Sequence, residues 1–330
     1  MESLELTENP WLNKSILITG SNGLLGSWLT KNLIQSANKV AGISLSPQDD
    51  NLIKSFKLTK DLDHFYFDIS DFDSLKDIFI KFKFDIVYHL AAQTQVLDAV
   101  KDPLTTFNSN IKGTWNILEL CKENNIPVVV ASSDKAYGES PNLPYEESDY
   151  LNGIYPYDVS KTVTDLLCRT YYETYKLNVG VLRCGNIYGG GDMNWDRLIP
   201  GSIKSLLNIE QPVLRSDGKF VREWIYVEDV VQAYEKMGIA VINNKNNYLS
   251  YNFSSGESYK VIDIYNKISL LIKNEIIEPK YIINSNEEIP NQTLNSSLIK
   301  KDLNIESIYN FEDSITKTID WYKSYFKNKL

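Results

Sequence analysis

Residues 15–34 read SILITGSNGLLGSWLTKNLI, and this stretch decides the fold. Its first five residues are a short apolar run that is typical of a buried β-strand. Three glycines, Gly20, Gly23 and Gly26, follow directly, and the apolar residues after them recur at a spacing of three and four, as on a helix. The segment therefore predicts a strand, a tight glycine turn and a helix.

The same alternation continues through the first half of the chain. Apolar runs that predict strands occupy 39–45, 64–70, 85–92, 127–133 and 178–187, and the main helical patterns between them occupy 105–124 and 157–175. Buried strands that alternate with helices imply right-handed crossovers and a parallel sheet covered on both faces. We therefore predict a doubly wound, Rossmann-like α/β fold with a smaller C-terminal substrate-binding domain.

The pattern changes after Tyr188, and this change places the domain boundary. We expect a dinucleotide-binding domain over 1–187, to which the chain returns around 224–253, and a mainly substrate-binding part over 188–330. The apolar pattern after residue 255 predicts less regular elements. The asparagine-rich stretch 242–252 is expected to be a loop.

Composition and charge narrow the range of partners. The chain has 330 residues with 34 basic and 43 acidic side chains, and the net charge of -9 argues against a nucleic-acid partner. Its three cysteines, Cys121, Cys168 and Cys184, form no close pair, so we predict neither a disulfide framework nor a metal site. The N-terminus has no signal-peptide pattern and no apolar run is long enough for a membrane span. These features predict a cytoplasmic protein without a membrane partner.

The glycine turn indicates a dinucleotide site, because it lets the backbone approach a pyrophosphate at a helix N-terminus. The alternative is a turn that only serves packing. The spacing Gly20-x-x-Gly23-x-x-Gly26 resembles the extended short-chain dehydrogenase/reductase family, and the segments Asp68-Ile69 and Leu90-Ala91-Ala92 agree with it. The resemblance implies that a dinucleotide is held by Gly20, Asn22, Gly23, Leu24, Leu25, Gly26, Asp68, Ile69, Leu90, Ala91 and Ala92.

The choice between NAD and NADP depends on the second strand. This strand ends Gly42-Ile43-Ser44-Leu45 and lacks the acid that binds the ribose hydroxyls of NAD in many such folds. No arginine stands there to bind the 2′-phosphate of NADP. We predict NAD.

A tyrosine and a lysine four residues apart provide candidate catalytic groups. Only the pair Tyr157/Lys161 opens a helix directly after the fifth sheet strand, which ends with Ser132 and Ser133. The spacing of four places both side chains on one helical face. We predict that Lys161 lowers the pKa of Tyr157 and holds the nicotinamide ribose, while Ser133 binds the substrate hydroxyl. The pairs Tyr172/Lys176 and Tyr325/Lys329 are expected on solvated helix surfaces.

Asp134 and Lys135 follow Ser133 at the carboxyl edge of the sheet, where doubly wound folds bind ligands. They are either an ion pair at a strand end or an acid and a base that extend the chemistry beyond redox. Sugar epimerases of the resembled family generally carry small or uncharged residues here, whereas its 4,6-dehydratases place an acid and a base. The resemblance therefore favours Ser133, Asp134, Lys135, Tyr157 and Lys161 as the catalytic set.

Six further segments resemble the CDP-glucose 4,6-dehydratase branch of the family, which also lacks the second-strand acid. They are residues 26–34, 40–47, 89–96, 102–119, 132–138 and 183–201. The resemblance implies conversion of an NDP-hexose to an NDP-4-keto-6-deoxyhexose through transient oxidation at C4 by bound NAD. Residues 219–229 resemble the general sugar-nucleotide epimerase pattern instead, so they do not indicate which nucleotide base the substrate carries. A 4-epimerase or 4-dehydrogenase and a non-catalytic dinucleotide-binding protein are the alternatives.

Arginine is scarce, with five residues against 29 lysines, yet Arg183, Arg197, Arg215 and Arg222 lie within 40 positions. A planar guanidinium suits a nucleotide diphosphate. We expect structural roles for Arg183 and Arg215. The predicted sugar-nucleotide contacts are Gln93, Asn110, Asn186, Arg197 and Arg222.

The two longest predicted helices, 105–124 and 157–175, have apolar residues on more than one stripe. These residues are Trp115, Ile117, Leu118, Leu120, Leu166, Leu167, Tyr171, Tyr172 and Tyr175. Additional apolar faces are typical of a covered surface. We predict a homodimer that forms a four-helix bundle.

Overall fold

The computed structural model describes residues 9–47, 52–243, 248–282 and 289–327. Its centre is a seven-stranded sheet in the order β10-β6-β5-β4-β1-β2-β3, in which all neighbouring strands are parallel. The strands are β1 (Ser15–Thr19), β2 (Lys39–Ser44), β3 (Leu62–Tyr66), β4 (Ile86–His89), β5 (Val128–Ser133), β6 (Val179–Cys184) and β10 (Leu249–Phe253). The predicted doubly wound α/β fold is confirmed.

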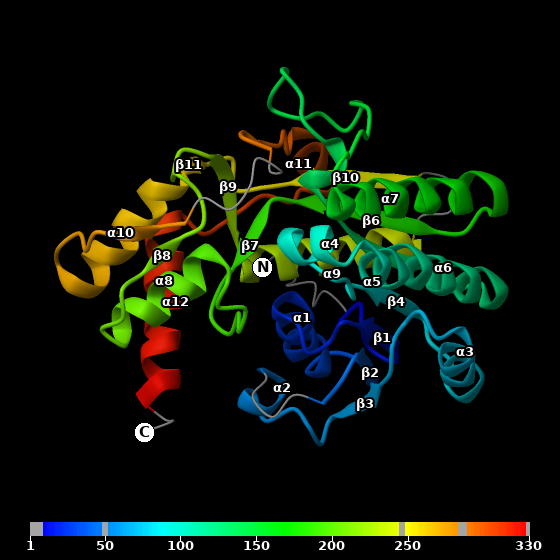
Figure 1. The fold of residues 1–330 in the computed structure, drawn as a ribbon. Helices are drawn as coiled ribbons and strands as arrows, with labels where there is room; N and C mark the ends of the chain where they lie inside the picture. The colour runs from blue at the N-terminus through cyan, green and yellow to red at the C-terminus, as the bar shows by residue number, and fades with distance from the viewer. Residues whose placement is uncertain (1–8, 48–51, 244–247, 283–288, 328–330) are drawn as a thin grey trace, which may run out of the picture.

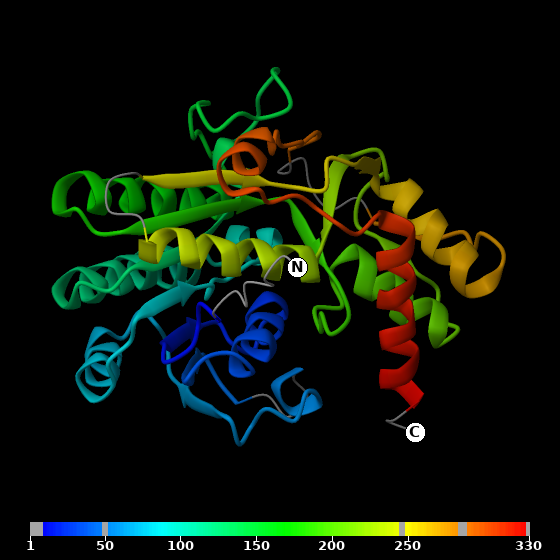
Figure 2. The ribbon, with the colours of Figure 1, turned by 180° about the vertical axis from the view of Figure 1, so that it is seen from behind.

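Helices cover both faces of this sheet (Figures 1 and 2). One face carries α3 (Phe72–Lys81), α4 (Val96–Lys101), α5 (Pro103–Phe107), α6 (Gly113–Asn124) and α7 (Pro156–Tyr175). The other face carries α1 (Leu24–Ile34) and α9 (Val227–Asn243), with α2 (Leu52–Ser55) packed against α1. Strand β1 shows why both faces are needed, because Leu17 packs toward the first face while Ile16 and Ile18 pack toward the second.

The predicted helix over 105–124 is interrupted. It consists of α5, a π-helical turn over Asn108–Lys112, and α6. Asp102 begins it by accepting a hydrogen bond from the Thr105 amide, and Pro103 occupies its first position. Single π-helical turns occur often at functional sites, and this one contains Asn110.

The second part of the chain is more regular than the sequence analysis expects. It contains a three-stranded sheet of β11 (Ser258–Lys260), β9 (Val221–Tyr226) and β7 (Asn186–Tyr188), and a pair of β12 (Lys280–Tyr281) with β8 (Val213–Leu214). Its helices are α8 (Leu198–Leu207), α10 (Val261–Lys273), α11 (Ser297–Leu303) and α12 (Phe311–Lys327). Helix α12 buries Phe311, Ile315, Ile319 and Tyr322 at helical spacing, a pattern that we missed among the polar residues.

The expectation of a loop over 242–252 was wrong for its last residues. Strand β10 pairs in parallel with β6 and forms one edge of the central sheet. Its asparagine, Asn252, is fully buried, but its side chain accepts a hydrogen bond from the Tyr137 hydroxyl and donates one to the Tyr145 carbonyl. Tertiary partners therefore satisfy a residue whose local preference is for turns.

Candidate active site

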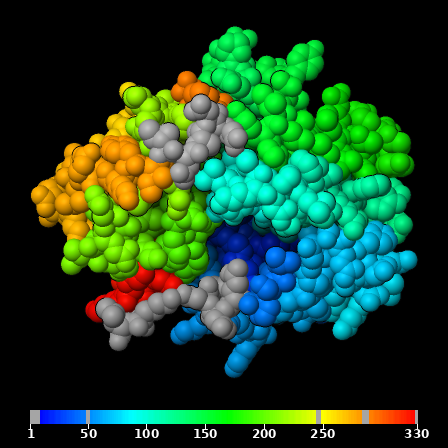
Figure 3. All heavy atoms as spheres, in the orientation of Figure 1, coloured from blue at the N-terminus to red at the C-terminus, as the bar shows by residue number. Residues whose placement is uncertain are grey.

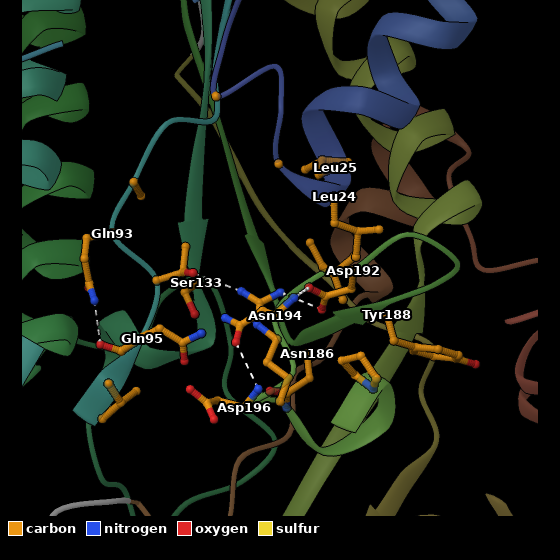
Figure 4. Close-up of a pocket in the computed structure, with 18 of the residues that line it drawn as sticks. Leu24, Leu25, Gln93, Gln95, Ser133, Asn186, Tyr188, Asp192, Asn194 and Asp196 are labelled. Atoms are coloured by element: carbon orange, nitrogen blue, oxygen red, sulfur yellow. Dashed lines mark hydrogen bonds and ion pairs between the residues drawn. The ribbon is translucent and has the colours of Figure 1, made fainter. Parts of the chain in front are cut away.

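A cleft of about 1060 Å³ runs along the carboxyl ends of the central strands. Figure 3 shows it as a hollow between the two parts of the chain. Leu24 and Leu25 at the start of α1 lie on one side of the cleft with Asp192 of the segment after β7 beside them, Gln93 lies on the other side, and Ser133 lies between them at the end of β5 (Figure 4). This is where a doubly wound sheet places a ligand.

The glycine turn has the geometry of a pyrophosphate cradle. Gly20 has a φ of +74°, and a Cβ atom there would lie 2.8 Å from the Ala91 nitrogen. A Cβ atom on Gly26 would lie 2.2 Å from the Gly20 oxygen, so α1 packs directly against the turn. Gly23 begins α1 without a side-chain cap, so no side chain caps the amides of the first turn, and they suit an anion.

The structure brings all the predicted dinucleotide-binding residues into this cleft. The lining includes Gly20, Asn22, Gly23, Leu24, Leu25, Gly26, Asp68, Ile69, Leu90, Ala91, Ala92, Tyr157 and Lys161. The cleft extends from the turn past the end of β2 in one direction and to Tyr157 in the other. Its lining residues and the close backbone approach at the glycine turn fit an extended dinucleotide such as NAD.

Ser133, Asp134 and Lys135 form a compact group at the end of β5. The Ser133 hydroxyl donates to the Asp134 Oδ1 atom at 2.8 Å and accepts from the Lys135 amide at 3.2 Å. Ser133 also hydrogen-bonds with the Tyr157 side chain. Asp134 is 5% exposed and Lys135 is 9% exposed, although both line the cleft. An acid and a base are thus held close to Tyr157.

Tyr157 and Lys161 lie in the first turns of α7, which begins with Pro156. Burial raises the pKa of Tyr157, and the positive charge of Arg197 opposes this rise. Burial lowers the pKa of Lys161 to about 8, and its Nζ atom donates to the Ala131 carbonyl at 2.8 Å. Arg197 is the cation that opposes the rise of the Tyr157 pKa in this structure. The effect predicted for Lys161 stays a prediction.

Of the other two tyrosine and lysine pairs, Tyr172, Lys176 and Tyr325 do not line the cleft. The Lys176 ammonium is 5.8 Å from the centre of the Tyr172 ring, and Lys176 is exposed at the end of α7. Tyr325 packs against Trp321 on α12, while Lys329 lies outside the described residues.

Arg197 connects the two walls of the cleft. One of its nitrogens donates to the Asp192 carboxylate at 3.0 Å and another donates to the Thr94 hydroxyl at 3.0 Å. It lies directly before α8 and lines the cleft. Arg215 also lines the cleft and forms an ion pair with Asp196.

The two remaining arginines of the group are buried. Arg183 makes a two-pronged hydrogen bond with Asp165, at 2.8 and 2.7 Å, and Asp165 also accepts from Ser132 at 2.8 Å. This pair holds β6, β5 and α7 together behind the catalytic group. Arg222 lines the cleft, but its nitrogens donate to the carbonyls of Val221, Pro290 and Ile289.

Of the other predicted substrate residues, Gln93 and Asn186 line the cleft, whereas Asn110 does not. Asn110 is 1% exposed, accepts from the Gln93 amide at 2.7 Å and donates to the Gln93 carbonyl at 2.9 Å. It also donates to the Ser160 hydroxyl at 2.9 Å. The structure therefore does not support the substrate contact predicted for Asn110. Its amide is used to hold the Gln93 segment against α7.

A buried histidine, which the sequence analysis did not select, links the two halves of the site. His89 Nδ1 lies 2.8 Å from the Thr19 hydroxyl, directly before the glycine turn, and Nε2 lies 3.0 Å from the Thr114 hydroxyl. Thr114 in turn donates to the Asn110 carbonyl at 2.6 Å. Burial, aided by the Lys161 charge, lowers the pKa of His89 to about 3, so the ring is neutral at pH 7. His89 is one of only two histidines in the chain, and this scarcity is the sequence feature that could have drawn attention to it.

Comparison with known proteins identifies the family. The family model described as "NAD dependent epimerase/dehydratase family" matches residues 16–252. The chain belongs to this family. A CDP-glucose 4,6-dehydratase of Salmonella typhimurium is 32% identical over 242 residues, which are 69% of this chain and 67% of that protein. A UDP-glucuronate 4-epimerase of Thermodesulfobacterium geofontis is 28% identical over 93% of this chain and 95% of that protein.

A solved structure of dTDP-glucose 4,6-dehydratase from Bacillus anthracis, in complex with NAD, has the same fold. Its TM-score is 0.82 at 24% identity, over 94% of this chain and 97% of that one. Family membership and the fit of the cleft agree on NAD as the cofactor of this protein. Within the described ranges, the acidic, histidine and cysteine side chains form no cluster of three or more that could hold a metal ion, and no helix there has the length and hydropathy to cross a membrane.

Proposed function

We propose that this protein is a nucleotide-sugar 4,6-dehydratase that converts an NDP-hexose, with CDP-glucose as the first candidate, to an NDP-4-keto-6-deoxyhexose and water. The observation that carries the proposal is the burial of Asp134 and Lys135 in the cleft, beside Ser133 and Tyr157. Burying ionisable groups is unfavourable, and such groups with perturbed surroundings occur often at functional sites. Oxidation or epimerisation at C4 alone would need neither an extra acid nor an extra base.

Tyr157 is the group that accepts the proton of the C4 hydroxyl. Its hydrogen bond with Ser133 and the charge of Arg197 favour its ionised form, while burial opposes it. The glycine turn, Tyr157 and Lys161 would hold NAD, which would supply a hydride acceptor for C4 and a hydride donor for C6. Lys161 lies one turn further along α7, where its ammonium adds positive charge beneath the same end of the cleft.

Asp134 and Lys135 serve the elimination. A ketone at C4 makes the C5 proton acidic, and the Lys135 amine, in its deprotonated form, removes it. Asp134, held by the Ser133 hydroxyl, gives its proton to the departing C6 hydroxyl, which leaves as water. The protonated Lys135 returns the proton to C5 when the hydride reaches C6. The proton that Tyr157 took from the C4 hydroxyl replaces the one that Asp134 gave to the leaving oxygen, so the net change is the loss of one water.

The test is incubation of the protein with CDP-glucose, UDP-glucose and dTDP-glucose, followed by mass spectrometry of the product. Loss of one water without added reductant supports the dehydratase. A product of unchanged mass with inverted C4 would make the protein a 4-epimerase, which its similarity to the UDP-glucuronate 4-epimerase makes the second candidate. Stoichiometric reduction of added NAD would make it a 4-dehydrogenase, and absence of any product would indicate a binding protein.

The proposal also covers cofactor retention and assembly. Because the hydride returns to the same sugar, NAD has no need to leave between turnovers, and the purified protein should release NAD on heating.

The outer surfaces of α5, α6 and α7 expose Leu104, Trp115, Leu166 and Tyr175 at 71, 55, 49 and 52%. These neighbouring helices support a homodimer through a four-helix bundle. A monomer in light scattering at micromolar concentration would contradict it.

A further inference from the structure

The end of the cleft formed by β2 and β3 lacks a carboxylate at the end of β2, where many doubly wound folds bind the adenosine ribose of NAD. Ser44 is the last residue of β2, and it lines the cleft while being only 6% exposed. A hydroxyl at this position binds a ribose well only if its direction is fixed. The surroundings of Ser44 show how this is achieved.

Three groups hold the Ser44 hydroxyl. Its Oγ atom lies 3.0 Å from the Ser21 Oγ atom and 3.0 Å from His64 Nε2, and it accepts a hydrogen bond from the Asn22 amide at 3.1 Å. The cluster is tightly packed, because a Cβ atom on Gly42 would lie 2.5 Å from the Ser21 Oγ atom. The position of the Ser44 hydroxyl is therefore determined by the turn, by β2 and by β3 together.

His64 fixes Ser44 without adding a charge. Burial lowers the pKa of His64 to about 4, so its ring is neutral at pH 7. The Nδ1 atom lies 3.0 Å from the Tyr66 hydroxyl, and the two rings are 4.4 Å apart. A neutral imidazole has one donor and one acceptor, so Nδ1 can pair with the Tyr66 hydroxyl while Nε2 faces the two serine hydroxyls.

Asn22 supplies a second acceptor beside Ser44. Its Nδ2 atom donates to the Ser46 carbonyl at 3.2 Å, which fixes the direction of the amide. Its Oδ1 atom is buried and has no hydrogen-bond partner among the described residues, although Asn22 lines the cleft. A buried acceptor without a partner is unfavourable. A ligand hydroxyl in the cleft would satisfy it.

We infer that Asn22 Oδ1 and Ser44 Oγ together replace the carboxylate of other folds and bind the hydroxyls of the adenosine ribose of NAD, with His64 and Ser21 orienting Ser44. The inference rests on NAD as the cofactor and not on the reaction that follows. Both groups are neutral, and the part of the cleft lining described here, over 43–46 and 67–69, contains no lysine or arginine for a 2′-phosphate. Selection of NAD over NADP therefore depends on hydroxyl recognition.

The direct test compares NAD with analogues that lack the 2′ or the 3′ hydroxyl of the adenosine ribose, by calorimetry on the full chain freed of bound dinucleotide. The parent protein should bind at least one analogue about tenfold more weakly than NAD, the loss expected for one hydrogen bond. Ser44→Ala should bind NAD about tenfold more weakly and should no longer distinguish NAD from that analogue. Ser36→Ala, at the far end of α1, is the matched control and should bind both as the parent does. Parental affinity and discrimination in Ser44→Ala would overturn the inference.

Two further variants keep the test decisive if Ser44→Ala does not fold. Asn22→Asp places a carboxylate at the inferred ribose contact, and the ratio of NADP to NAD affinity should fall by about tenfold or more through repulsion of the 2′-phosphate. An unchanged ratio would contradict the inference. His64→Phe should weaken NAD binding several-fold, while His64→Gln, which retains a donor and an acceptor, should bind nearly as the parent. Equal binding by both His64 variants would remove His64 from the inference. NAD binding by a protein that transforms no sugar would reject the proposed function and leave this inference intact.

Discussion

Around Tyr157, the cleft places four ionisable side chains, Asp134, Lys135, Lys161 and Arg197, whereas at the ends of β2 and β3 the buried polar side chains Ser21, Ser44 and His64 are neutral. Both ends are built on carboxyl ends of parallel strands, and both are held by short hydrogen bonds. The difference follows from what each end does. Proton transfer requires groups that can change charge, whereas recognition of ribose hydroxyls requires only fixed donors and acceptors.

The largest effect that separates the two ends should come from Tyr157→Phe. It removes the hydroxyl that takes the C4 proton, and we expect the rate of dehydration to fall by on the order of 10⁴-fold, with C4 oxidation lost as well. Mass spectrometry of the product and absorbance of NADH measure the two steps. Tyr172→Phe, on the same helix, is the control and should retain parental rates. Substantial turnover by Tyr157→Phe would show that the charged end does not work as described.

A second substitution at the end of the cleft around Tyr157 should separate oxidation at C4 from the loss of water. Lys135→Ala removes the base for C5 and should slow water loss by about 10³-fold, while oxidation at C4 continues and NADH accumulates on the enzyme. Single-turnover absorbance with mass spectrometry separates the steps, and Lys176→Ala at the exposed end of α7 is the control. If Lys135→Ala dehydrated the sugar at the parental rate, Lys135 would be only an ion-pair partner. The epimerase or dehydrogenase would then be the better proposal.

The hydrogen bonds that support the two ends of the cleft should differ in how much they contribute to the free energy of unfolding. Asp165→Ala leaves the buried Arg183 guanidinium without its carboxylate and should lower the free energy of unfolding by at least about 3 kcal/mol. At the neutral end, Ser21→Ala removes a hydroxyl contact and should lower it by only about 1 kcal/mol. Urea unfolding followed by fluorescence measures both. Equal losses would show that the two ends do not differ in this respect.

Near neutral pH, the smallest predicted effect is a pH dependence from His89. Its pKa is about 3 in the folded protein and about 6.5 when unfolded, so the unfolded chain binds the proton more readily. The free energy of unfolding should therefore fall as the pH falls from 6.5 toward 3, by up to about 1.4 kcal/mol per pH unit from this group. In His89→Gln that part of the slope should disappear. Identical slopes in the parent and the variant would show that His89 does not remain neutral in the fold.

Much of this architecture follows from local sequence. Gly20 and Gly26 are needed because side chains there would collide with the segment after β4 or with the backbone of the turn, and a Cβ atom on Gly23 would make a tight contact of 3.2 Å with the Gly20 oxygen. Tyr157 could be selected from three similar pairs because of its place after the fifth strand. The spacing of these residues along the chain was enough to select them, although the contact that excludes a side chain at Gly20 is with Ala91 after β4.

Other features depend on contacts between distant segments, which no local pattern contains. Asn110 was expected to meet the substrate, but its amide is satisfied by Gln93 and Ser160. The cation that acts on Tyr157 comes from Arg197 in the loop before α8, and β10 forms from a stretch with the composition of a loop. The sequence determined which groups were available and which strands and turns would form. Only the tertiary structure decided which partners those groups met, because hydrogen bonding and desolvation depend on neighbours in space.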